Sequence, residues 1–209
     1  DADVIAWVKH VEDPSRFGVA VRDGERVTRL VEKPDEPISN EALIGIYYVN
    51  ELADLHDQIN YLIEHDVRGK GGEFQLTDAF DRMLQAGQRF ETASVAAWMD
   101  CGTIPALLET TGRILEREAD DLRHGTVEDS VIREPVYIGP GATVTGSVVG
   151  PHVSVEAGAT VAGAVVKDSI VFQDAHVEAA VLDGSVVGRS ATVKHATGTV
   201  NVGDHSSVE

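Results

Sequence analysis

The chain has 209 residues, of which 43% are hydrophobic and 25% charged, a composition typical of folded globular proteins and unlike disordered or collagen-like chains. With 35 acidic and 17 basic residues the formal net charge is −18, and such a surface repels nucleic-acid phosphates and anionic lipids. No apolar run approaches the roughly 20 residues of a membrane-spanning helix, and the single cysteine, Cys101, cannot form an internal disulfide. We therefore expect a cytoplasmic protein that binds neither nucleic acid nor membranes.

The first half alternates strand and helix patterns. Strands are predicted over residues 4–8, 17–21, 26–32 and 42–49, where apolar runs are bounded by turn residues. A helix follows, in which apolar residues recur at spacings of three and four from Leu52 to Ile63, with Asn50 as its N-cap. Two more helices are predicted, one over about 78–86 that ends before Gly87 and one after Thr103. The alternation predicts an α/β layer protein.

From about residue 126 aromatic residues almost vanish. Eleven branched or leucine residues recur every five or six positions from Ile138 to Val193, so that three of them take 16 or 17 residues. This is the period of a hexapeptide-repeat parallel β-helix, in which each coil has three short strands. We expect about three and a half coils, with residues 197–209 out of register. An antiparallel β-sandwich is the alternative, which eleven matches to one register disfavour.

Four segments of the first half carry residues suited to chemistry, and each also has a plain structural explanation. Glu32 and Lys33 lie at the end of a strand, before a proline, but Glu–Lys pairs are also common as surface ion pairs. Gly45 lies in an apolar strand, where glycine permits close backbone approach or simple core packing. Thr77 follows a glycine-rich loop as a predicted helix cap. Asp100 offers the carboxylate oxygens that Mg²⁺ prefers, or caps the helix after it.

In their order and spacing these segments resemble the sugar-1-phosphate nucleotidylyltransferase family. The matching segments are Asp13-Pro14-Ser15-Arg16-Phe17-Gly18, Glu32-Lys33-Pro34, Ser39-Asn40, Gly45-Ile46-Tyr47, Gly72-Glu73, Leu76-Thr77-Asp78, and Trp98 with Asp100, Gly102 and Thr103. The most similar group is the glucose-1-phosphate thymidylyltransferase and mannose-1-phosphate guanylyltransferase type with a C-terminal hexapeptide domain. The resemblance implies transfer of a nucleotidyl group from a nucleoside triphosphate to a hexose 1-phosphate, with Mg²⁺ as cofactor and pyrophosphate as leaving group.

The resemblance also implies roles for individual residues. Lys33 and Asp100 are the implied catalytic residues, and Asp100 is the implied Mg²⁺ ligand. The implied substrate-binding residues are Gly18, Glu32, Lys33, Gly45, Tyr47 and Trp98. Glu32 is expected to accept hydrogen bonds from sugar hydroxyls, and Lys33 is expected to face the phosphate.

The implied fold is a partial Rossmann-like α/β domain over residues 1–124 followed by a left-handed parallel β-helix over 125–209. The first domain is expected to hold the sugar-phosphate side of the site, and the β-helix is expected to join the chain into a homo-oligomer. The glycine-rich nucleotide-binding loop and the first metal-binding aspartate of the family have no match here. We therefore expect a C-terminal part of a longer enzyme that is inactive, or nearly so, by itself.

Two other functions remain open for the β-helix. Hexapeptide domains often belong to acyltransferases that use a histidine as a base, and His152, His176 and His195 are the candidates here. Acetyl transfer to an amino-sugar phosphate would distinguish this function from nucleotidyl transfer. The other possibility is a non-catalytic assembly module, in which the histidines face solvent at the corners of the coils.

Overall fold

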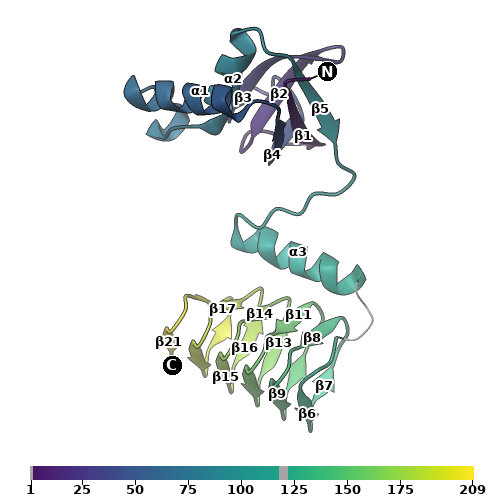
Figure 1. Ribbon diagram of the computed structural model, residues 1–209. Coiled ribbons are helices and arrows are strands. Elements are labelled where there is room, and N and C mark those ends of the chain that lie inside the picture. The colour runs from purple at the N-terminus through teal and green to yellow at the C-terminus, as the bar shows by residue number, and fades with distance from the viewer. Residues whose placement is uncertain (1, 118–121) are drawn as a thin grey trace. The chain divides into compact units, whose positions relative to one another are not determined.

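The structure is a computed structural model that describes residues 2–117 and 122–209. It divides into two compact units, Asp1–Trp98 and Met99–Glu209 (Figure 1). No helix in these described ranges is long and apolar enough to cross a membrane.

The first unit is a mixed sheet with two helices. Its elements are β1 (Val4–His10), β2 (Gly18–Asp23), β3 (Arg26–Glu32), β4 (Glu41–Val49), α1 (Leu52–Glu64), a 3₁₀ turn (Lys70–Gly72), α2 (Leu76–Gln85) and β5 (Phe90–Ser94). The strand order is β3-β2-β4-β1-β5, in which β1 pairs antiparallel with β4 and parallel with β5. The core lies between this sheet and α2, where Phe80 and Met83 meet Val4, Ala6 and Phe90.

The four predicted strands of the first unit are confirmed, but β5 was missed because Phe90 is its single large apolar residue. The predicted cap at Asn50 is wrong, since α1 begins at Leu52 and Glu51 occupies the N-cap position without a side-chain bond. Thr77 is not a cap either, because it is the second residue of α2. At the β3 edge of the sheet, α2 satisfies one backbone donor, because its Asp81 carboxylate accepts the Leu30 N–H at 2.9 Å.

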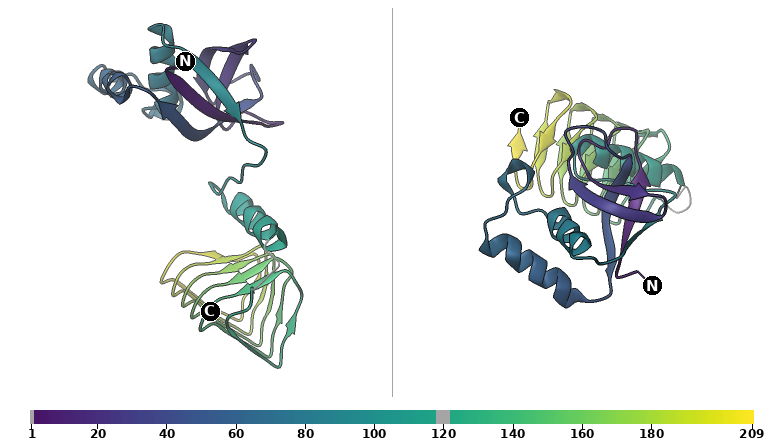
Figure 2. Two further views of the ribbon diagram at one scale, coloured as in Figure 1. Left: turned by 45° about the vertical axis from the view of Figure 1, so that its right-hand side comes forward. Right: turned by 90° about the horizontal axis from the view of Figure 1, so that it is seen from above.

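The second unit consists of α3 (Ile104–Arg117) and a parallel β-helix with three faces (Figure 2). We name the faces by what they present to the outside. The threonine face contains β6 (Thr126–Glu128), β9 (Thr143–Thr145), β12 (Thr160–Ala162), β15 (His176–Glu178), β18 (Thr192–Lys194) and β21 (Ser207–Val208). The valine face contains β7 (Val131–Ile132), β10 (Val148–Val149), β13 (Val165–Lys167), β16 (Val181–Asp183) and β19 (Thr197–Gly198). The helix-covered face contains β8 (Val136–Ile138), β11 (Val153–Val155), β14 (Ile170–Val171), β17 (Val186–Val187) and β20 (Asn201–Val202).

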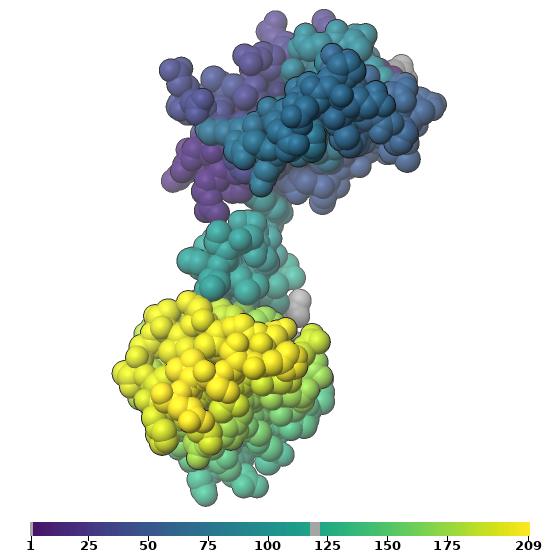
Figure 3. Space-filling view, turned by 90° about the vertical axis from the view of Figure 1, so that its left-hand side faces the viewer, coloured from purple at the N-terminus to yellow at the C-terminus, as the bar shows by residue number. Residues whose placement is uncertain are grey.

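The predicted parallel β-helix is confirmed, but it has more coils than expected. On the threonine face Thr126, Thr143, Thr160, His176, Thr192 and Ser207 are successive neighbours, so the chain completes five coils. Residues 197–209 do not leave the β-helix: β19, β20 and β21 pair with β16, β17 and β18. Thr192 and Ser207 are 15 positions apart, so a shorter last coil, and not a loss of structure, breaks the 16- or 17-residue period. Figure 3 shows these last coils, in yellow, as a continuous packed surface.

Helix α3 covers one face of the β-helix (Figure 1). Ser154 and Ile170 point outward from β11 and β14 and are nevertheless buried. On the valine face the outward residues Val131, Val165 and Val181 are instead 56%, 43% and 48% exposed. By its contacts α3 belongs to the second unit, although it lies within residues 1–124, the range predicted for the first domain.

Candidate active site

The centre of the candidate site is the carboxylate of Glu32, the last residue of β3. This side chain is only 15% exposed, and its Oε2 accepts a hydrogen bond of 2.6 Å from the Thr77 hydroxyl at the start of α2. Gly18, which pairs with Glu32 across the sheet, completes the packing. A Cβ at Gly18 would lie 2.7 Å from Oε2 and 3.0 Å from the Thr77 hydroxyl oxygen. Glycine is therefore needed here because the carboxylate fills the space that a side chain would take.

Two further acidic or phenolic groups surround this carboxylate. Burial, together with the charge of Glu32, raises the pKa of Tyr47 to about 12, so its phenol is neutral. The pKa of Asp78 is also raised, first by burial and then by the charges of Glu32 and Asp81. The Tyr47 ring packs on Phe80 with the centroids 4.5 Å apart, which fixes its place at the edge of the core. The cluster is rich in hydrogen-bond acceptors, the groups that sugar hydroxyls need.

Lys33 places a cation beside this cluster. Its ammonium is 4.0 Å from the Glu32 carboxylate and its side chain is 42% exposed, so it is accessible to an anion. The backbone of Lys33 has φ of +42°, an uncommon value for a residue with a Cβ. Two hydrogen bonds hold this turn: Lys33 N–H donates to the Phe17 carbonyl at 3.0 Å, and Lys70 Nζ donates to the Lys33 carbonyl at 2.8 Å. Lys70 also pairs with Asp35 at 2.6 Å.

A surface depression of about 470 Å³ opens at this turn, and Glu32, Lys33 and Lys70 are among the residues that line it. Trp98 is connected to the same turn, because its ring contacts Phe17 edge-on with the centroids 5.0 Å apart. Of the predicted substrate-binding residues, the structure thus gathers Gly18, Glu32, Lys33 and Tyr47, with Trp98 attached through Phe17.

Gly45 lies in an irregular part of β4, two residues before Tyr47. Here the three residues 44–46 face Trp7 alone on β1, and Gly45 has φ of +79°. A Cβ at Gly45 would meet no atom within 4 Å, so the surface above the glycine is open. Glycine is favoured in this bulge because it adopts the positive φ without strain.

Asp100 belongs to the second unit. Its Oδ1 accepts the Gly102 N–H at 3.0 Å, and its carbonyl accepts the Thr110 hydroxyl at 3.0 Å. The start of α3 is capped by Thr103, whose hydroxyl accepts the Ala106 N–H at 3.4 Å. Asp100 is therefore not the capping residue, and its Oδ2 accepts no hydrogen bond from the part of the chain that the structure describes.

The described residues contain no cluster of three or more His, Cys, Asp or Glu side chains that could hold a metal ion. Mg²⁺ commonly binds through one or two carboxylates together with substrate phosphates and water, rather than in an all-protein cage. The half-buried Asp100 carboxylate, with one oxygen that accepts no hydrogen bond from the described residues, fits the part of a single protein ligand in such a site.

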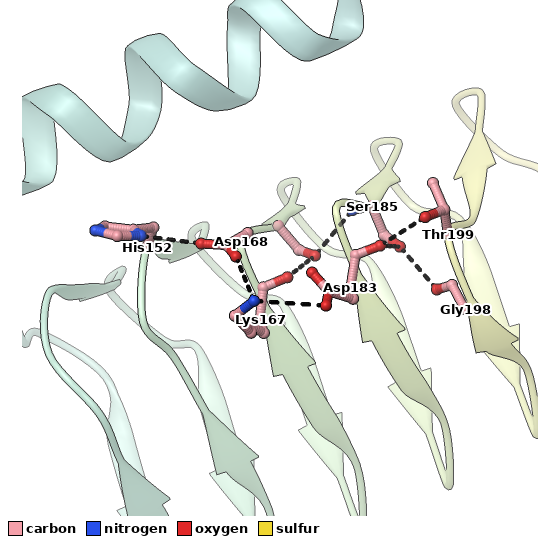
Figure 4. A network of polar contacts seen from close by, with 8 residues as sticks. His152, Lys167, Asp168, Asp183, Ser185, Gly198 and Thr199 are labelled. Carbon is pink, nitrogen blue, oxygen red and sulfur yellow. Dashed lines mark hydrogen bonds and ion pairs between the residues drawn. The ribbon is translucent and has the colours of Figure 1, made fainter.

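The histidines suggested as acyltransferase bases differ in their surroundings. His152 Nδ1 lies 2.9 Å from Asp168 and its Nε2 lies 3.1 Å from Glu116 (Figure 4 shows the contact with Asp168). Both ring nitrogens of His176 are also engaged, by Thr160 and by Glu178. His195 is exposed. A general base needs a free nitrogen facing its substrate, and the contacts of His152 and His176 leave none.

Two residues of the cluster were not among the predicted site residues. Thr77 was expected to cap a helix and Asp78 was noted only as part of a matching segment, yet both adjoin Glu32. The available signal was their position directly after a glycine-rich loop, which lets the first turn of α2 approach the end of β3.

The comparisons with known proteins identify the family of this chain. A family model described as "Nucleotidyl transferase" matches residues 1–117, and one described as "GlmU-like, C-terminal hexapeptide" matches residues 116–199. The chain belongs to the nucleotidyl transferase family, with a hexapeptide domain after the family's α/β part.

Three relatives show how far the similarity extends. A glucose-1-phosphate thymidylyltransferase of Streptomyces antibioticus is 30% identical over 96% of this chain and 62% of its own length. A second, of Streptomyces griseus, is 29% identical over 99% of this chain and 64% of its own length. The low-salt glycan biosynthesis nucleotidyltransferase Agl11 of Haloferax volcanii is 39% identical over 58% of this chain and 33% of its own length. The chain thus spans less than two thirds of each of these relatives.

Proposed function

We propose that this chain supplies the sugar-phosphate side of a reaction in which a nucleoside triphosphate and a hexose 1-phosphate give a nucleoside diphosphate sugar and pyrophosphate. The observation that carries the proposal is the Glu32–Lys33 pair, a shielded acceptor next to an accessible cation. Two of the relatives are thymidylyltransferases that act on glucose 1-phosphate by name, which supports a hexose 1-phosphate as substrate. Residues 1–124 are proposed as the substrate-binding domain and 125–209 as the β-helix domain, in a cytoplasmic enzyme.

In this reaction Glu32 accepts hydrogen bonds from sugar hydroxyls, while Gly18, Gly45, Tyr47 and Trp98 border the hexose. Lys33 neutralises the sugar phosphate and directs one of its oxygens at the α-phosphorus of the nucleotide. A bond forms between that oxygen and the α-phosphorus, and the bond to the β-phosphate bridge breaks, so the electron pair leaves with pyrophosphate. The chemistry depends on positioning and charge neutralisation and needs no covalent nucleophile on the protein. Mg²⁺, held through Asp100, would supply further neutralisation of the phosphates when bound.

The test is binding of glucose 1-phosphate to this chain, followed by calorimetry or ligand-observed NMR. Glu32→Gln and Lys33→Met should each weaken binding about 10-fold or more, because hydrogen bonds to charged groups contribute about 1.5–3 kcal/mol. Glu64→Gln is the matched control, since this exposed acid at the end of α1 is not among the residues that line the depression at Glu32 and Lys33. Equal binding by the wild-type chain, Glu32→Gln and Lys33→Met would contradict the proposed site.

We also propose that the β-helix joins copies of this chain. The row of Val131, Val148, Val165 and Val181 on the valine face supports self-association, since these outward apolar side chains are aligned on neighbouring strands and all except the half-buried Val148 are exposed. Sedimentation analysis of Val165→Lys against the wild-type chain tests this. A monomer at all concentrations for both proteins would refute it.

A further inference from the structure

Helix α3 is attached to the β-helix at its C-terminal half. Glu116, in its last turn, bonds to Nε2 of His152, and Nδ1 of the same ring bonds to Asp168. The backbone of α3 approaches the imidazole at Gly112, where a Cβ would lie 3.5 Å from the ring. Leu115 is 5% exposed. The end of α3 is thus fixed by a polar contact and by apolar burial, both within the second unit.

The other half of α3 holds the segment that contains Asp100. The Thr110 hydroxyl is buried and donates to the carbonyl of Asp100 at 3.0 Å, ten residues earlier in the chain. The neighbouring Thr111 makes an otherwise similar bond to Leu107 in its own helix, at 2.9 Å. Of these two threonines, Thr110 is therefore the one that connects α3 to the preceding turn, which the bond from Gly102 N–H to the Asp100 carboxylate closes.

We propose that Thr110 is a positioning residue for Asp100, and that the β-helix, through α3, fixes the position of this carboxylate. The inference rests on the role of Asp100 proposed above. Thr110 of α3 holds the backbone of Asp100, and His152 of the β-helix holds Glu116 of α3. The β-helix therefore contributes to the proposed metal site as well as to the proposed self-association. Ligand groups must be held to a fraction of an ångström by surrounding bonds, and outer partners of metal ligands commonly matter 10-fold or more.

The first test needs no metal and uses the full chain. Thr110→Val removes the hydroxyl but keeps the shape, and Thr111→Val is its matched control. We expect Thr110→Val to speed hydrogen exchange of the Gly102 amide about fivefold, the factor given by loss of one hydrogen bond, and Thr111→Val to leave it unchanged. Equal exchange in the two variants would overturn the proposal.

A second pair of variants tests the attachment to the β-helix. His152 and His195 both lie at corners of the β-helix, His152 between β10 and β11 and His195 between β18 and β19. Both have a left-handed backbone, with φ of +53° and +54°, and asparagine tolerates this conformation. His152→Asn should speed exchange of the Gly102 amide, whereas His195→Asn should not. If neither variant changes this exchange, the β-helix does not hold Asp100.

The third measurement uses Mn²⁺ alone as a probe, through its broadening of the Gly102 amide resonance. We expect Asp100→Asn to abolish the broadening and Thr110→Val to require several-fold more Mn²⁺ for the same effect, while Thr111→Val behaves as wild type. If broadening survives Asp100→Asn, the proposed metal role of Asp100 fails, while the exchange data still decide whether Thr110 positions this turn. If Asp100→Asn abolishes the broadening and Thr110→Val does not weaken it, the proposed function stands and the positioning role is refuted.

Discussion

The two units of this chain bury their cores in different ways. The α/β unit packs side chains of unlike shape, such as Phe80, Met83 and Phe90, around a single sheet. The β-helix repeats valine and alanine, and each inward residue lies over its equivalent one coil away, as Val144, Val161 and Val177 do. Stability in such a repeat is nearly a sum over neighbouring coils, whereas each position of an irregular core is unique.

The same contrast holds for polar groups. Serines at the corners of the β-helix, such as Ser147 and Ser185, are buried, and their hydroxyls donate to main-chain carbonyls. In the described residues the two buried side-chain oxygens without a partner, on Glu41 and Gln88, both belong to the α/β unit. Burial also raises the pKa of Tyr47 and Asp78 there. A repeat that satisfies its own polar groups leaves few for a ligand, which supports the proposal that the sugar-phosphate cluster around Glu32 lies in the irregular unit.

The largest expected effect is on the irregular core. Phe80 contacts both Tyr47 and Phe90, and Phe80→Ala should lower the free energy of unfolding of the α/β unit by about 3–5 kcal/mol. Both tryptophans, Trp7 and Trp98, lie in this unit, so tryptophan fluorescence follows its unfolding. Circular dichroism of the strand signal follows the β-helix as well.

The control for Phe80→Ala is Val161→Ala in the middle of the β-helix, which removes less volume from a fully buried site. We expect Phe80→Ala to shift the fluorescence transition. Val161→Ala should shift the part of the dichroism transition that fluorescence does not follow. Identical shifts of both signals in each variant would mean that the units unfold together, and the comparison between them would then have no energetic meaning.

A smaller effect is expected at Gly18, where a substitution adds a side chain that has no room instead of removing a large one. In Gly18→Ala the new methyl group collides with the Glu32 carboxylate, which should cost about 1–3 kcal/mol in the free energy of unfolding. It should also abolish binding of glucose 1-phosphate, because the carboxylate must move. Urea denaturation and calorimetry measure the two effects.

Gly24→Ala is the control for Gly18→Ala, because Gly24 has φ of +61° but open space around it. It adds backbone strain of about 1 kcal/mol and should leave binding intact. Loss of binding in both variants would mean that general destabilisation, and not the position of Glu32, is responsible.

The sequence predicts the repetitive unit better than the irregular one, and the reason is physical. An inward valine every five or six residues specifies the β-helix at every coil, so the fold is recognisable despite the miscounted ends. The cluster around Glu32 depends on the meeting of β2, β3 and α2, which no local pattern encodes. The family resemblance predicts Glu32 and Lys33 as site residues, but the bond from Thr77 to Glu32 emerges only when α2 is placed against the end of β3.

Thr77 offers a finer test of how the irregular unit supports its carboxylate. Thr77→Val keeps the side-chain shape and removes the hydroxyl that donates to Glu32. We expect a loss of about 1–2 kcal/mol in the free energy of unfolding, because a half-buried carboxylate loses a hydrogen bond. Thr77→Ser retains the donor and should lose less. A larger loss for Thr77→Ser than for Thr77→Val would show that the methyl group, and not the hydroxyl, matters here.

The smallest expected effect is the pH dependence of Asp78. Because its pKa is raised in the folded chain, first by burial and then by the charges of Glu32 and Asp81, ionised Asp78 destabilises the fold at neutral pH. This cost is absent below the unfolded-state pKa and complete above the folded-state pKa. Asp78→Asn should therefore raise the free energy of unfolding at pH 7 by less than about 1 kcal/mol, since the group is partly solvated.

This gain from Asp78→Asn should disappear as the pH is lowered through the window between the two pKa values, as thermal melts at successive pH values will show. Asp57→Asn, at a site on α1 whose carboxylate is 75% exposed, serves as the control and should give a negligible gain at either pH. Adding Glu32→Gln should shrink the gain from Asp78→Asn, because one of the charges that raise the Asp78 pKa is removed. A gain that is the same at pH 7 and at pH 3 would assign the effect to packing, and the electrostatic contrast between the two units would then rest on Tyr47 alone.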